Sequence, residues 1–503
     1  STADYGYLGG VISNIHTEYA SGVISDQSYT TGKLSATIVD DPKLGRTVTS
    51  YDIATGKPTS MTVAGKDGSN AATVYKNGIV STYTMTAADG SKVTDTYDTA
   101  GKRVSEVQVD TKNVWTTLQY DASGDVSRKF VQRPDGSSES YAYKLTGLAY
   151  ATEHQVVNTK GVVTLVERSR ADGTLVTTAQ VFADGGKISS TFGANGQLLT
   201  KVTNAADGTV TSLTYDATTA KLASSVVKTS AGATTTITYV AGAMSDRTVV
   251  RADGSRTSET FDATGLKTRQ VDVDTAKTYT TQVFDATTGK PQRTYVQYTD
   301  GRSIVTSYNV TGKSYVTEVQ ATDTAGKVVS VVRRHADNTL DYTDSYAADG
   351  KRTTTAYDAT GHRLNQTITA VGGGRVITTY DPTTGGLKSL LELAANGTII
   401  RSQTYSGGGL VNEDVVSEQG KVTYTYNSAG TKISQLQIDP DGTKTTTLYD
   451  ATSGAVTKVY VANPDGSGET RAYGLTGLAW STEIQLTDAT GKMVSLTRSA
   501  ADG

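Results

Sequence analysis

The chain has 503 residues, of which 36% are hydrophobic, 51 are glycine, 29 are tyrosine, only 5 are phenylalanine and none is cysteine. The 47 basic and 50 acidic residues are mixed along the chain, which excludes the basic stripe of a nucleic-acid-binding protein. No apolar run reaches the roughly 18 residues of a membrane-spanning helix, and the missing cysteines exclude disulfides and thiolate metal sites. Threonine, valine and tyrosine favour half-buried strands, so the composition predicts β-sheet without a thick apolar core.

Short patterns of two extended runs joined by Asp-Gly corners follow one another from residue 9 onwards. Runs rich in Val, Thr and Tyr between such corners are typical of β-hairpins. In the middle of the chain, aromatic residues mark one corner of each hairpin at intervals of 22–24 residues: Phe192, Tyr215, Tyr239, Phe261, Phe284 and Tyr308. No segment has the 3.6-residue periodicity of an amphipathic helix, so we expect an all-β array of antiparallel hairpins.

A longer period is superimposed on the hairpins. The stretches "TGLAYATEHQ", "TGKSYVTEVQ" and "TGLAWSTEIQ" end at Gln155, Gln320 and Gln485, which are 165 residues apart. We therefore predict three repeat units of seven hairpins, 9–173, 174–338 and 339–503, with residues 1–8 as the tail of a preceding unit. A constant period also predicts continuation of the same array, or self-association.

The recurring "YDATG" corner has a structural explanation. Its Asp accepts backbone N–H groups, its Gly takes the left-handed conformation, and its aromatic ring is expected to stack with the rings of neighbouring hairpins. The structural corner residues are Tyr97, Asp98, Tyr215, Asp216, Phe261, Asp262, Phe284, Asp285, Tyr357, Asp358, Tyr449 and Asp450.

Two further sets of residues recur with the 165-residue period. We predict ion pairs that fix the strand register, diagonally across two strands, between Glu153 and Arg168, Glu318 and Arg333, and Glu483 and Arg498. Aromatic residues also recur, at Tyr150, Tyr315 and Trp480. An exposed row of rings suits glycan contacts, although packing is the favoured role.

No catalytic motif is present: the sequence has no GxSxG, HExxH or Walker loop, and its 4 histidines do not cluster. We expect no enzyme activity and no catalytic, cofactor-binding or metal-binding residues. The acidic stretches "DPDG" (439–442) and "DVDTA" (272–276) suit a weak Ca²⁺ site, but plain turns are the favoured interpretation.

The alternation of strand, "YDxxG", basic residue, strand and "DG" resembles the YD repeats of the Rhs, Tc-toxin and teneurin proteins. The best matches are "YDTAGKRV" (97–104), "FDATGLKT" (261–268) and "YDATGHRL" (357–364). The resemblance implies a hairpin strip that spirals into a hollow β-tube or shell. The "DPxGLxGG" signature that ends an Rhs shell is absent.

If one 165-residue unit were one turn, its fourteen strands would give a tube roughly 21 Å across, from strands about 4.8 Å apart. We expect an extracellular structural protein that forms a fibre, tube or stalk at the bacterial cell surface. The alternatives are an adhesin that binds surface glycans and a YD-repeat shell that encloses a toxin cargo.

Overall fold

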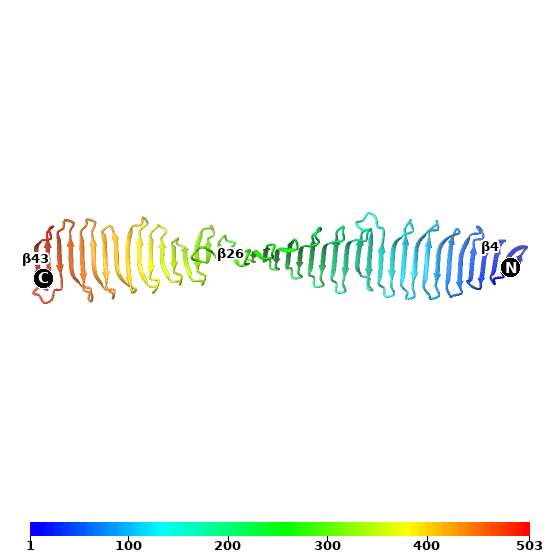
Figure 1. Ribbon diagram of the computed structural model, residues 1–503, viewed down its shortest axis with the longest axis horizontal. Helices are drawn as coiled ribbons and strands as arrows, with labels where there is room; N and C mark the ends of the chain where they lie inside the picture. Colours follow the sequence, from blue (N-terminus) through cyan, green and yellow to red (C-terminus); the bar gives the residue numbers. More distant parts are fainter. The chain divides into compact units, whose positions relative to one another are not determined.

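The computed structural model describes residues 1–503, and every regular element in it is a β-strand. The chain divides into two compact units, Ser1–Ala252 (unit 1) and Asp253–Gly503 (unit 2). Within each unit, every strand pairs antiparallel with its neighbours in the chain, which gives a continuous meander (Figure 1). The structure contains no helix of the length and hydropathy needed to cross a membrane.

The strands of unit 1 are β1 (Thr2–Leu8), β2 (Val11–Glu18), β3 (Ile24–Thr30), β4 (Lys33–Asp41), β5 (Gly45–Tyr51), β6 (Pro58–Gly65), β7 (Asn70–Lys76), β8 (Ile79–Thr86), β9 (Lys92–Tyr97), β10 (Arg103–Val109), β11 (Trp115–Tyr120), β12 (Val126–Gln132), β13 (Ser138–Ala142), β14 (Thr152–Val157), β15 (Val163–Ser169), β16 (Leu175–Val181), β17 (Lys187–Phe192), β18 (Leu198–Asn204), β19 (Val210–Tyr215), β20 (Leu222–Lys228), β21 (Thr234–Val240) and β22 (Ala243–Val250).

The strands of unit 2 are β23 (Arg256–Phe261), β24 (Lys267–Val273), β25 (Tyr279–Phe284), β26 (Pro291–Gln297), β27 (Ser303–Ser307), β28 (Thr317–Thr322), β29 (Val328–Arg334), β30 (Leu340–Tyr346), β31 (Arg352–Tyr357), β32 (Arg363–Thr369), β33 (Arg375–Tyr380), β34 (Leu387–Leu393), β35 (Ile399–Ser406), β36 (Gly409–Ser417), β37 (Gly420–Tyr426), β38 (Lys432–Ile438), β39 (Lys444–Tyr449), β40 (Val456–Ala462), β41 (Gly468–Ala472), β42 (Thr482–Thr487) and β43 (Met493–Ser499).

The predicted all-β array of hairpins is confirmed, with seven hairpins in each 165-residue period. Residues 9–173, 174–338 and 339–503 each hold fourteen strands, β2–β15, β16–β29 and β30–β43. The compact units do not follow this period, so the division into three repeat units stays a prediction from the sequence.

Neither sheet closes on itself. Within each unit, no strand packs against a strand other than its chain neighbours. A wound tube of fourteen strands per turn would bring each strand beside the one fourteen positions later, and unit 1 is long enough to show such contacts but has none. The expected winding into a hollow tube or shell is therefore not seen within a unit.

Each unit is a single layer with almost no apolar core. Unit 1 has no buried hydrophobic side chain, and unit 2 has only Val273 and Ala472. The other buried side chains are polar and lie within strands: Thr73, Asp95, Glu106, Ser190, Ser225, Ser303, Asp344 and Thr355. Since antiparallel sheets normally pack one face on a core, both sheets leave unusually much of their surface open to solvent.

The register gives each sheet two distinct faces, because residues directly opposite one another on paired strands share a face. The corner rings, such as Tyr97 and Tyr215 in unit 1 and Phe284 and Tyr449 in unit 2, lie on what we call the aromatic face. The opposite face carries the residues beside the longest loops, including Glu153 and Arg168, and is called the loop face.

Candidate functional site

The corner Asp residues organise the turns by accepting hydrogen bonds. Asp262 accepts from the backbone N–H of Thr264 (2.8 Å) and of Leu266 (3.0 Å), and from the Thr264 hydroxyl (2.7 Å). These donors lower the pKa of Asp262, with the Thr264 hydroxyl contributing most. Gly265 completes the corner with φ 87°, a left-handed conformation that favours glycine.

The same arrangement recurs at the other predicted corners. Asp98, Asp216, Asp285, Asp358 and Asp450 each accept backbone N–H groups from residues two to four positions further along the chain. The corner carboxylates therefore stabilise the turns by accepting backbone hydrogen bonds.

The corner rings do not stack on one another, so that expectation is wrong. Equivalent corners lie two strands apart, or about 9.6 Å, whereas rings in contact have centroids about 4.5–7 Å apart. At several corners a cation fills the gap: a basic residue six positions after one corner ring reaches the ring of the next corner. The distances to the ring centroids are 4.4 Å for Arg103 and Tyr120, 4.8 Å for Lys267 and Phe284, and 4.2 Å for Lys432 and Tyr449.

Once in each 165-residue period, a long loop replaces the short corner. It joins β13 to β14, β27 to β28 and β41 to β42. Its backbone closes in the same way each time: the N–H of Leu145, Val310 and Leu475 donates to the carbonyl six residues later, at 2.9–3.0 Å. The loop is thus a regular feature of the array.

Each loop places an aromatic ring against an ion pair. The Arg168 Nε atom lies 2.6 Å from Glu153 Oε2, and the Arg168 guanidinium lies 5.0 Å from the Tyr150 ring centroid. In the next period, Arg333 lies 2.7 Å from Glu318 and 4.8 Å from the Tyr315 ring. In the last, Arg498 lies 2.7 Å from Glu483 and 4.1 Å from the Trp480 ring.

The two residues of the loop ion pair lie in a different register from the predicted one. Glu153 pairs directly opposite Arg168, not diagonally, because a β-bulge shifts the register by one residue between Val156 and Val157. Burial raises the pKa of Glu153, but hydrogen bonds from Arg168 and Gln155 outweigh that effect and the net shift is downward.

A recess lies beneath the first loop, on the loop face. Its volume is about 480 Å³, and residues of β11–β14 and of the loop line it, among them Gln119, Arg128, Phe130, Leu148 and Tyr150. The lining combines aromatic and aliphatic side chains with a few polar groups, as in ligand-binding pockets generally. On sequence alone, Tyr150 is considered as a glycan contact, with packing as the favoured role, and neither Arg128 nor Phe130 is singled out.

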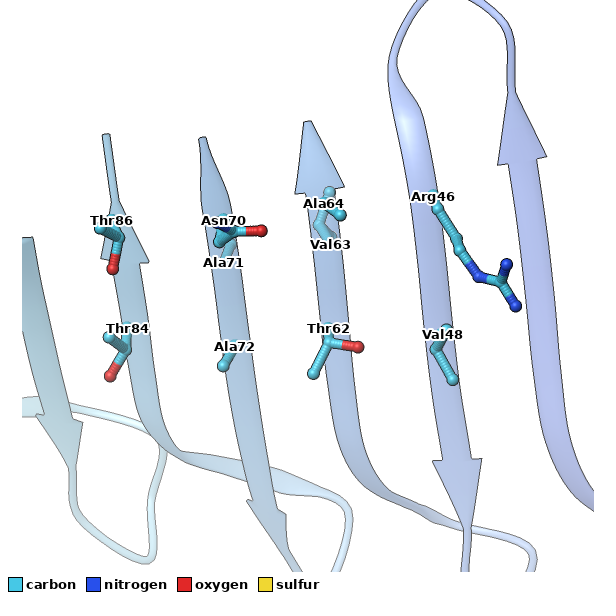
Figure 2. A pocket seen from close by; sticks show the side chains of 10 residues that line it. All are labelled: Arg46, Val48, Thr62, Val63, Ala64, Asn70, Ala71, Ala72, Thr84 and Thr86. Carbon is cyan, nitrogen blue, oxygen red and sulfur yellow. The ribbon is translucent and has the colours of Figure 1, made fainter. Parts of the chain in front are cut away.

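A second hollow, of about 350 Å³, crosses β5–β8 (Figure 2). Small side chains such as Ala64, Ala72, Thr62 and Thr84 line it, and Arg46 is the only charged side chain in the lining. No acid–base pair or set of convergent donors is present, so this hollow has no chemistry of its own.

The histidine and the acidic stretches that the sequence analysis considered do not come together in one site. His154 stacks on Tyr141, with centroids 4.3 Å apart, and lies 3.2 Å from Glu167. In the stretches considered for Ca²⁺, Asp441 accepts from the Thr443 N–H and Asp274 from the Thr278 N–H, both as turn residues. The structure brings no three His, Asp or Glu side chains together as a metal site.

Comparisons with known proteins give no family. No family model and no curated protein matches the chain. Among solved structures, it is similar to a crystal structure of TcdB2-TccC3-Cdc42 (TM-score 0.16, 10% identity, covering 94% of this chain and 35% of that one). It is also similar to TcdB2-TccC3 (0.15, 10%, 98% and 40%) and to the Photorhabdus luminescens Tc holotoxin pore (0.13, 10%, 96% and 34%). The chain spans between about a third and two fifths of the length of these proteins. TM-scores and sequence identities this low do not establish a family.

Proposed function

We propose that the chain is a structural wall element: a length of β-hairpin array that forms a fibre, tube or stalk at the bacterial cell surface, without catalytic activity. The observation that carries this proposal is the open, single-layered sheet. Its contacts repeat with the sequence period, as the three loop ion pairs show. Repeat proteins grow in this way, from units that contact only their neighbours.

We expect one face of each exposed sheet to become buried when the protein assembles. Burying apolar surface contributes about 25 cal/mol per Å², and unit 1 has no buried hydrophobic side chain. The aromatic face is the better candidate, because each aromatic ring contributes about 150–250 Å² to such burial. In a fibre or tube, further segments of the array or other copies of the chain cover it.

Light scattering over a dilution series tests this proposal with two matched variants. Met85 on β8 is 41% exposed on the aromatic face, and Val74 on β7 is 47% exposed on the loop face. The wild-type chain is expected to assemble beyond its 52.7 kDa monomer mass. Met85→Lys should block assembly and Val74→Lys should not. A wild-type chain that stays monomeric at every concentration contradicts the proposal.

A second function, a shell that encloses a toxin cargo, is favoured by the YD corners and their Asx-type turns. Winding of one continuous array would also cover one face, without a second copy. Limited proteolysis of the full gene product separates the two functions. A shell protects a segment outside the array from cleavage, whereas a fibre leaves such a segment accessible.

A further inference from the structure

We propose that the recess under the β13–β14 loop is a binding site for an acidic oligosaccharide, with a sugar ring on Phe130 and a sugar carboxylate on Arg128. The proposal goes beyond the structural function and does not depend on it, because the recess is formed within unit 1 alone.

The floor of the recess suits the apolar side of a sugar ring. Phe130 lies on β12 and is 41% exposed, although it is directly opposite Thr117 on β11 and Ser140 on β13. A pyranose ring presents C–H groups on its flat face and hydroxyl groups at its rim. Stacking on Phe130 would therefore leave the hydroxyl groups beside the polar side chains of Thr117, Gln119 and Ser140, all of which line the recess.

The charge of the recess selects an acid. The Glu153 carboxylate is already paired with Arg168, 2.6 Å away. Arg128, which is exposed and lies two residues before Phe130 on the same face, forms no ion pair in the structure. A guanidinium binds a carboxylate through two parallel hydrogen bonds, which a neutral sugar cannot provide.

The same pair of residues recurs at the same place in the array. A basic residue followed two positions later by an aromatic one stands before each long loop: Arg128 and Phe130, Arg293 and Tyr295, Lys458 and Tyr460. All three basic side chains are exposed. The loop ring also recurs, but Leu148 at the loop tip corresponds to Lys313 and Leu478. This pattern predicts one site per 165 residues, with the basic–aromatic pair as its constant part.

Calorimetric titration with trigalacturonic acid tests the proposal, with its methyl ester as the uncharged control. Saturable binding of the acid to the wild-type chain is expected. Replacing all three floor rings (Phe130→Ala, Tyr295→Ala and Tyr460→Ala together) should abolish binding. Phe130→Ala alone should reduce the number of sites or weaken binding by at least about tenfold. Phe182→Ala is the matched control, because Phe182 is 42% exposed and lies outside the recess.

The charge contact is tested separately. Arg128→Gln should weaken binding of the acid at the first site by about tenfold and leave binding of the methyl ester unchanged. Triglutamate serves as an acidic peptide of similar charge. The proposal would be overturned if the acid showed no saturable binding, or if the ester or triglutamate bound as tightly as the acid. It would also be overturned if Phe182→Ala lost as much binding as Phe130→Ala.

Discussion

The ammonium group of Lys432 lies 4.2 Å from the centre of the Tyr449 ring, which belongs to the next hairpin corner. Lys432 stands six residues after the preceding corner ring, Tyr426, and begins β38. At this corner, as at those that follow Arg103 and Lys267, a cation thus links one hairpin to the next on the aromatic face. Such contacts contribute to stability in a sheet that has almost no apolar core.

Removing such a cation should weaken the local sheet. Lys432→Gln is expected to lower the free energy of unfolding by at least about 0.5–1 kcal/mol, the strength of one cation–ring contact at an exposed site, because Lys432 is half-buried and also lies 5.3 Å from the Tyr424 ring centroid. Hydrogen exchange of the β37–β40 amides measures the loss. Lys444→Gln on β39 is the control, because Lys444 is exposed and contacts no ring. Equal exchange rates in both variants would show that the contact adds nothing.

The loop ion pairs should be coupled energetically. A double-mutant cycle with Glu318→Gln and Arg333→Met is expected to give about 0.5–1 kcal/mol, because the Glu318 side chain is only 17% exposed. The reference cycle uses Asp300 and Arg302, which lie 2.7 Å apart but are 44% and 58% exposed. That surface pair should couple by about 0.2 kcal/mol or less. The same coupling in both cycles would contradict a role for the loop pair in fixing the register.

Corner Asp residues should make stability depend on pH. The folded pKa of Asp262 is lowered, so its contribution is present above its unfolded pKa of about 4 and is lost as the pH falls through its folded pKa. Asp262→Asn keeps the turn acceptor, as Asn427 does naturally, where its Oδ1 accepts from the Ala429 and Thr431 N–H groups. The variant should lose less stability between neutral pH and pH of about 3 in denaturant titrations.

The converse substitution is the control for that prediction. Asn427→Asp should gain a pH-dependent component in the same range, provided that its carboxylate accepts the same two N–H groups. An unchanged acid response in both variants would mean that the corner carboxylates do not set the pH dependence.

Left-handed corner glycines should resist substitution even where space is free. A Cβ atom on Gly265 would meet nothing within 4 Å, yet its φ is 87°. Gly265→Ala should therefore cost about 1–2 kcal/mol through backbone strain alone. Gly372→Ala has equal space and no left-handed φ, and should be neutral or slightly stabilising. Thermal unfolding of both variants compares them directly.

Local features of the array could be predicted from the sequence, because strands and corners depend on nearby residues. The hairpin period, the Asp acceptors and the corner glycines follow from composition and spacing. The prediction of ring stacking is wrong, because a strand that begins with Arg103 or Lys267 separates equivalent corners, and its cation, not another ring, contacts the next corner ring.

The recess was missed for a related reason. Arg128 and Phe130 on β12 meet a loop that begins only after β13, so the lining comes from residues that are separated along the chain by a whole strand. A usable signal did exist: the basic–aromatic pair recurs at intervals of 165 residues, at Arg293 and Tyr295 and at Lys458 and Tyr460.

Electron cryomicroscopy of the assembled chain tests the structural function most directly. We expect continuous filaments or tubes, in which strands lie about 4.8 Å apart and the aromatic face of each sheet is covered by another part of the array. Dispersed particles with both faces of the sheet exposed to solvent would contradict it.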